Sequence, residues 1–153
     1  MAWLSAGAGS LTSLQHTLSD ADRDFRSAFE TYLVLPSHFN HEAHVRLAYV
    51  YLVEHDVEAA VEKMRQALLN FLEHNEIPRS KYHETLTRAW ILAVRHFMNR
   101  SGASNSAAEF IEANRQLLDS QLMLTHYSAA VLFSPDARAS FVEPDIDPIP
   151  PVS

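Results

Sequence analysis

The chain contains no cysteine and only three glycines among its 153 residues. Without cysteine it has no disulfide framework and no thiolate chemistry, and the compartment in which it folds is left open. So few glycines argue against a fold rich in sheets and turns, and also against a glycine-rich phosphate loop. The scarcity of cysteine and glycine therefore excludes more fold classes than functions.

Basic residues are also scarce, with 12 Lys and Arg against 19 Asp and Glu and a formal net charge of −7. Nucleic acids are bound through a basic face that this chain hardly supplies, so we expect no nucleic-acid partner. No apolar run approaches the ~20 residues of a membrane span, and Met1 to Leu4 do not resemble a signal peptide. We therefore expect a cytoplasmic protein that does not bind membranes.

What remains is ordinary for a globular protein, with 47% apolar and 20% charged residues in a length typical of one domain. Apolar residues recur at helical spacing after Ser, Asp or Asn, the residues that cap helices. These patterns predict an all-α, single-domain bundle of five to seven helices. We expect a flexible segment over 1–18, the bundle over 19–142 and an extended, proline-rich tail over 143–153. The expected helices cover 21–33, Ser37 or Asn40 to 55, 57–74, Ser80 through 97, 107–118, Asp119 or Ser120 to 132, and a short stretch after Ser134.

Two histidine-bearing segments, His41-Glu42-Ala43-His44 and Tyr82-His83-Glu84-Thr85, stand at predicted helix starts. Short loops predict that their two helices run parallel, with the 57–74 helix between them, so that both segments fall at one end of the bundle. The positive end of a helix dipole favours neutral imidazole, which is the form that binds metals. The sequence therefore predicts a site in which several imidazoles converge.

The candidate metal ligands are His41, His44 and His83, and the candidate cofactor is one divalent transition metal, Fe, Zn, Ni or Cu. Three nitrogens with an open position would activate a bound water, and a carboxylate with two histidines would suit non-haem Fe(II). Glu84 is a candidate general base or fourth ligand, and Tyr127 a candidate hydrogen-bond donor. Whether the chain is an enzyme, and on which small molecule it would act, is left open.

Plainer interpretations compete with this one. Glu84 precedes Arg88 by four residues, the spacing of a surface ion pair within a helix. Arg138 and Asp145 could form a salt bridge that holds the tail. His16 and two other histidines, His55 and His74, stand at predicted helix ends, where solvated side chains are expected.

Several of these motifs occur together in a recognisable order. The chain resembles, over about residues 38–150, a family of small all-helical bacterial proteins known only as uncharacterised. The resemblance implies a shared fold or a shared site, and no particular reaction. The residues that carry it are His41-Glu42-Ala43-His44-Val45-Arg46-Leu47-Ala48, Tyr82-His83-Glu84-Thr85-Leu86-Thr87, Tyr127-Ser128, Ala137-Arg138 and Glu143-Pro144-Asp145.

A second resemblance favours a different class of function. Small and aromatic residues from Leu47 to Ala67 fit the spacing of one tetratricopeptide hairpin, but Tyr82 stands where the small Ala48 should recur. A single unit does not stack into a solenoid. The alternative hypothesis is therefore a non-catalytic helical interaction module, which would present its tail or a helix groove to a partner or, as a homodimer, to its own copy.

Overall fold

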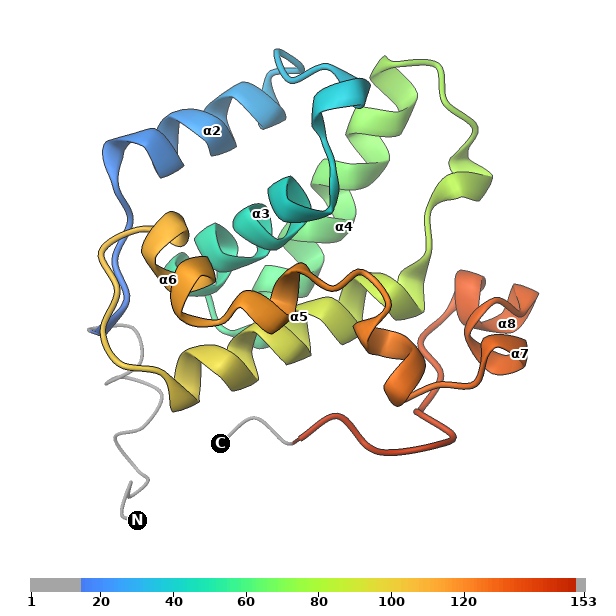
Figure 1. Cartoon of the computed structure of the whole chain (residues 1–153). Coiled ribbons are helices and arrows are strands. Elements are labelled where there is room, and N and C mark those ends of the chain that lie inside the picture. Colours follow the sequence, from blue (N-terminus) through green and yellow to red (C-terminus); the bar gives the residue numbers. More distant parts are fainter. Residues whose placement is uncertain (1–14, 151–153) are drawn as a thin grey trace.

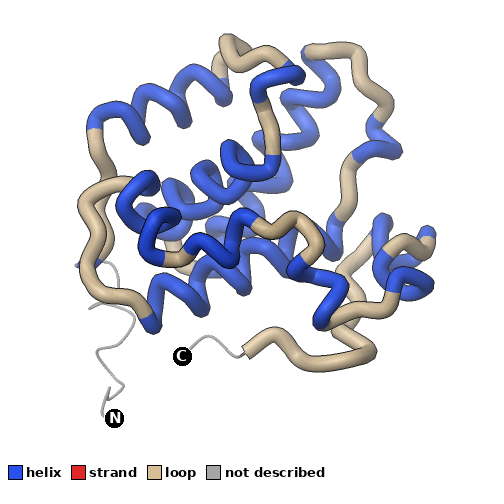
Figure 2. Tube along the Cα trace, viewed as in Figure 1, coloured by secondary structure: helices blue, strands red, loops and turns tan. Residues whose placement is uncertain are grey.

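The structure is a computed structural model that describes residues 15–150 of the chain. Within that range it contains seven α-helices, four 3-10 helices and no β-strand, so the predicted all-α fold is confirmed (Figure 1; Figure 2). The α-helices are α2 (Asp20–Glu30), α3 (His41–Glu54), α4 (Val57–His74), α5 (Glu84–Arg100), α6 (Ala107–Ala113), α7 (Ala129–Leu132) and α8 (Pro135–Ala139). The 3-10 helices are η2 (Pro36–His38), η3 (Arg79–Lys81), η4 (Arg115–Leu118) and η5 (Leu122–Thr125).

Short polar side chains fix where most of the α-helices begin. Each accepts a hydrogen bond from the main-chain N–H three residues further on, which satisfies one of the unpaired donors of the first turn. At α2 the cap is a complete capping box, because Asp22 also accepts from the N–H of Ser19. The capping residues of this kind are Ser19, Asn40, Asp56, Ser106, Ser128 and Ser134.

The centre of the core is α3. Seven of its residues are buried, and six of these follow one another without a break from Leu47 to Leu52. A helix that is apolar on all sides is stable only where other helices surround it. Helices α2, α4, α5 and α6 pack against α3 on different sides (Figure 1). Helices α3, α4 and α5 also pack against one another, so they form the framework that carries the shorter elements.

The chain leading into α2 is fixed to this framework by a buried histidine. His16 is fully buried, its Nε2 lies 2.8 Å from the carbonyl oxygen of Met98, and its Nδ1 lies 2.7 Å from Oγ of Ser104. The hydroxyl of Tyr49 lies 2.7 Å from the same Oγ. The expectation that His16 is solvated is therefore wrong. Of the segment predicted to be flexible, residues 15–18 are packed here, and residues 1–14 lie outside the described residues.

The sequence between α6 and α8 departs furthest from the prediction. Instead of two helices over 107–118 and 120–132, the chain forms α6, two 3-10 turns and the four-residue α7. Asn114 ends α6 with a hydrogen bond from its side chain to the carbonyl of Phe110, and Asp119 accepts from the N–H of Gln121. These side chains satisfy main-chain groups locally, so the helix does not continue. The irregular path still buries Leu117 and Met123 in the core.

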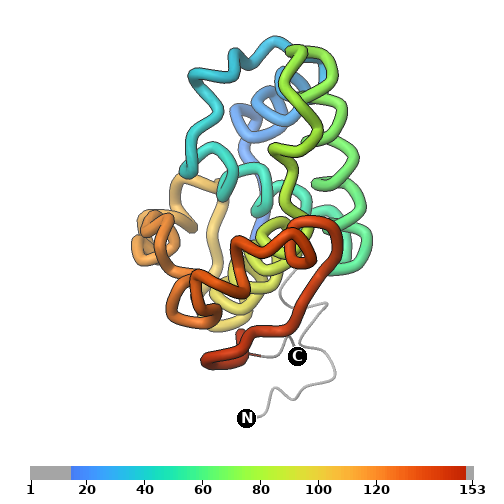
Figure 3. The backbone as a smooth tube through the Cα atoms, turned by 90° about the vertical axis from the view of Figure 1, so that its right-hand side faces the viewer, coloured from blue at the N-terminus to red at the C-terminus, as the bar shows by residue number. Residues whose placement is uncertain are grey.

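The C-terminal part of the chain lies across α5, as its orange and red trace shows in Figure 3. Helix α8 packs against α5, and residues 141–150 form no helix. Val142 and Ile149 pack against the core as partly buried side chains. No helix in the described part of the chain is long and apolar enough to cross a membrane.

Candidate functional site

His41 and His44 lie near each other at the start of α3. The Nε2 of His41 donates to the carbonyl oxygen of Leu117, 2.9 Å away, and its ring centroid lies 4.6 Å from that of Trp90. His44 packs edge-on against Phe39. Burial, and to a smaller extent the neighbouring His41, lowers the pKa of His44 to about 4. His44 is therefore neutral at pH 7, and the cause is burial and the neighbouring His41, whereas the sequence-based prediction rested on the helix dipole.

His83 lies elsewhere and uses both of its ring nitrogens. It is the N-cap of α5, where its Nδ1 accepts from the N–H of Leu86 at 3.1 Å. Its Nε2 donates to the carbonyl oxygen of Leu132 at 2.7 Å. A carbonyl cannot donate, so Nε2 carries the hydrogen and the ring is neutral. Burial lowers the pKa of His83, in agreement with this tautomer.

The structure thus brings His41 and His44 together and leaves His83 apart. His41 lies beside Trp90, which follows His83 by seven residues on α5 and so lies about 10 Å further along the helix axis. Among residues 15–150, no three His, Asp or Glu side chains are grouped so that they could hold a metal ion. The metal site stays a prediction from the sequence.

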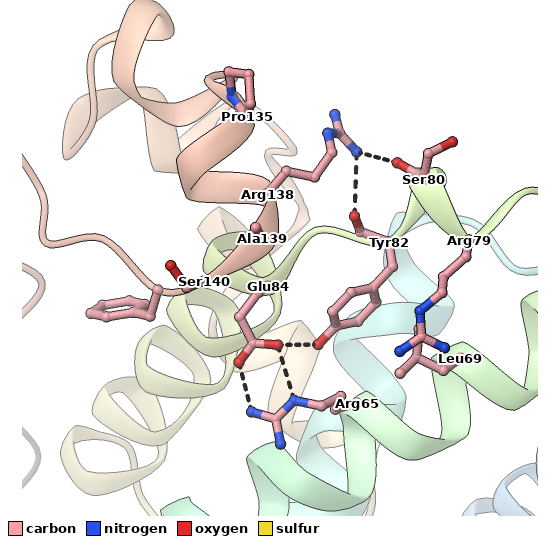
Figure 4. Close-up of a pocket in the computed structure, with 11 residues that line it drawn as sticks. Arg65, Leu69, Arg79, Ser80, Tyr82, Glu84, Pro135, Arg138, Ala139 and Ser140 are labelled. Carbon is pink, nitrogen blue, oxygen red and sulfur yellow. Dashed lines mark hydrogen bonds and ion pairs between the residues drawn. The ribbon is translucent and has the colours of Figure 1, made fainter.

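Glu84 forms the floor of a cleft bordered by α4, η3, α5 and α8 (Figure 4). Arg65 of α4 donates to both carboxylate oxygens, from Nε at 3.0 Å and from Nη2 at 2.6 Å. The hydroxyl of Tyr82 donates to Oε1 at 2.7 Å. This is the two-pronged geometry in which an arginine binds a carboxylate most strongly. The predicted i to i+4 pair of Glu84 with Arg88 does not form, because Arg88 pairs with Glu58 of α4 instead.

These contacts fix the charges on the floor of the cleft. The hydrogen bonds from Arg65 lower the pKa of Glu84, so the carboxylate is charged at neutral pH. Burial raises the pKa of Tyr82 to about 12, so its hydroxyl keeps its proton. A carboxylate stabilised in this way is a weak base, which disfavours the general-base role that the sequence suggests for Glu84. In this position Glu84 instead holds the side chains of Arg65 and Tyr82.

Two further arginines face the cleft without a carboxylate partner. Arg138 of α8 donates only through Nη1, to the carbonyl oxygens of Ser80 at 3.1 Å and Tyr82 at 3.5 Å. The predicted salt bridge of Arg138 with Asp145 is wrong. The side chain of Arg79 makes no hydrogen bond or ion pair with any residue in the described ranges. The cleft has a volume of about 690 Å³, within the usual range of small-molecule sites.

One wall of the cleft, formed by residues 135–141, is held in place by hydrogen bonds to the motif residues. Thr85 donates to the carbonyl of Ser140 at 3.0 Å and accepts from the N–H of Val142 at 3.0 Å. Tyr127 donates to the carbonyl of Val142 at 2.6 Å, and His83 binds the end of α7 just before the wall. We call residues 128–142 the C-terminal wall segment. Tyr127 is buried, so its hydroxyl orients this segment and does not face the cleft.

Asp145 completes the fixation of the wall segment by a contact that the sequence does not suggest. Its carboxylate accepts from the N–H of Ser128 at 2.8 Å, and this hydrogen bond lowers the pKa of Asp145. Arg65 and Arg79 are likewise functional candidates that sequence reasoning misses. The sequence carries only a weak signal for this site, which is Tyr82 two residues before Glu84 at a helix start. It does not show which arginine faces Glu84, because that arginine lies on another helix.

Comparison of the chain with protein-family models, curated proteins and solved structures finds no match in any of the three.

Proposed function

We propose that the chain binds a small oxyanion-bearing molecule, such as a carboxylate or a phosphate ester, in the cleft of Glu84 and its arginines. The observation that carries this proposal is the state of two arginines. Six of the ten arginines form an ion pair with a carboxylate, whereas Arg79 and Arg138 face one cleft without such a pair. Guanidinium groups bind carboxylate and phosphate oxygens in planar, directional pairs.

The balance of charge supports an anionic ligand. Three arginines and one glutamate line the cleft, so its side chains carry two more positive charges than negative ones, in a chain with a formal net charge of −7. The ion pair of Arg65 with Glu84 is neutral, so Arg79 and Arg138 carry this surplus. The free donors of Arg138 are Nε and Nη2, because only Nη1 binds the protein.

The test is a titration of the purified chain with phosphate, acetate and citrate at low ionic strength, followed by calorimetry and by thermal unfolding. Binding at 100 times the dissociation constant should stabilise the fold by about 2.7 kcal/mol. Arg79→Gln should weaken binding at least tenfold. Arg100→Gln is the matched control, because it removes the same charge from the far end of α5. Equal binding by both variants, or no binding of any anion, would overturn the proposal.

Two exposed leucines favour the alternative hypothesis, a non-catalytic interaction module. Leu33 and Leu35, in the connection between α2 and α3, are exposed to 75% and 58%. Large apolar side chains exposed in this way mark protein contacts when they form a continuous patch. No partner chemistry distinguishes this surface, so the anion-binding cleft remains the function that we propose.

A further inference from the structure

An apolar groove continues from the arginine cleft along the end of α4. It is lined by Leu69, Leu72, Glu73, Ile77 and Arg79 and has a volume of about 330 Å³. Leu69 and Arg79 also line the cleft, so the two hollows share a border. Figure 4 shows the side chain of Arg79 beside Leu69 at this border.

The apolar lining of the groove is not part of the hydrophobic core. Leu69, Leu72 and Ile77 are partly buried, yet none of them belongs to the core or packs against it. The chain reverses direction here, with Glu76 at a positive φ of 56° and the N–H of Ile77 bonded to the carbonyl of Leu72. This turn places Ile77 and Arg79 next to the last turns of α4. Glu73 is the only acid in the described part of the chain that lines the groove; it is exposed and forms no ion pair with Arg79.

We infer that the ligand is an amphiphilic anion, with its oxyanion at Arg79 and a short apolar chain in the groove of Leu69, Leu72 and Ile77. The inference rests on the proposed function and adds the ligand class to it. A cationic cleft that opens directly into an apolar groove binds both ends of such a molecule, whereas a purely polar anion would leave the groove in water. Burying a methylene group removes apolar surface from water, and each one therefore strengthens binding.

The experiment uses two series of straight-chain ligands at concentrations below micelle formation. One series runs from acetate to octanoate and the other from methyl to octyl phosphate, so that the two possible oxyanions are compared at equal chain length. Full burial of one methylene group raises the affinity about fourfold. An open groove buries each methylene on one side only, so we expect the affinity to rise about twofold per methylene. Leu72→Gln and Ile77→Thr should flatten this dependence and leave the affinity for acetate or methyl phosphate unchanged.

Ile146→Thr is the matched control for Ile77→Thr, because it makes the same substitution at an isoleucine that is exposed to 59% and lies beside His126, on another part of the molecule. It should retain the full dependence on chain length. If short anions bind but affinity does not rise with chain length, or rises equally in Leu72→Gln, this inference is wrong and the proposed function stands. If no member of either series binds, the proposed function fails and the inference fails with it. Circular dichroism of each variant shows whether it is folded before the titration is interpreted.

Discussion

Replacement of His83 is the sharpest test of how the site is built, because its two nitrogens have separate tasks. Nδ1 caps α5 by accepting from Leu86, and Nε2 binds the carbonyl of Leu132 at the last residue of α7. Asparagine at this position would retain the cap, since it is among the best N-cap residues, but it is too short to reach Leu132. Alanine would lose both contacts.

The expected magnitudes follow from these contacts. His83→Asn leaves the carbonyl of a buried residue without its donor, which costs about 2 kcal/mol. His83→Ala adds the loss of the cap, about 1 kcal/mol, for a total of about 3 kcal/mol. The free energy of unfolding is measured by urea denaturation at pH 7.5 with far-ultraviolet circular dichroism, and the slope with urea should not change.

A histidine without these contacts provides the control. His38 is exposed on η2, and its replacement by alanine should change stability by less than about 0.5 kcal/mol. Equal losses in the asparagine and alanine variants would refute the capping role of Nδ1. Losses no larger than that of the control in both would refute the wall contact as well.

Two further predictions concern protonation and metal binding. Because burial lowers the folded-state pKa of His44 from 6.5 to about 4, the unfolded chain takes up this proton first, and stability falls as the pH falls from 6.5 towards 4. The contribution of His44 at pH 5 should be about 2 kcal/mol lower than at pH 7, and urea titrations of His44→Gln at the two pH values should lack this loss. Plasma mass spectrometry of the purified chain and of the His41→Ala/His83→Ala double variant tests the predicted metal site, which requires near-stoichiometric Fe, Zn, Ni or Cu that the variant loses.

Helix positions were predictable wherever local chemistry fixes them. Asp56 and Ser134 cap helices at the predicted starts, and one of the two candidates caps each of the first two helices, Ser19 rather than Asp20 and Asn40 rather than Ser37. A side-chain oxygen and a nearby N–H need no tertiary context. The start of α5 was misplaced for a related reason. Ser80 is a good cap by type, but the chain forms η3 first and His83 caps the helix. Histidine is not among the preferred caps, so a capping pattern read from the sequence does not select it.

The site was less predictable because its groups meet across helices. Glu84 has two arginines within reach, Arg88 four residues along its own helix and Arg65 on α4. Packing of α4 against α5 decides between them, since it presents Arg65 to Glu84 and Glu58 to Arg88. No periodicity within one helix contains that information. Arg79 is still harder to predict from the sequence, because it is a candidate only through the absence of a carboxylate partner among the described residues of the folded structure.

Three of the motif residues, His83, Thr85 and Tyr127, share one structural role, which is to hold the C-terminal wall segment beside the cleft. His83 and Thr85 at the start of α5, and Tyr127 just before α7, all bind main-chain groups of residues 132–142, and their side chains are buried or engaged. Arg138 lies within that same stretch, on a helix of five residues that could not keep its position alone. A wall held by several hydrogen bonds keeps the guanidinium of Arg138 beside Ser80 at the edge of the cleft before any ligand arrives (Figure 4), so less ordering is needed on binding. His83, Thr85 and Tyr127 look like members of a catalytic cluster in the sequence. In the structure they hold the main chain that carries Arg138, and so they act on the cleft indirectly.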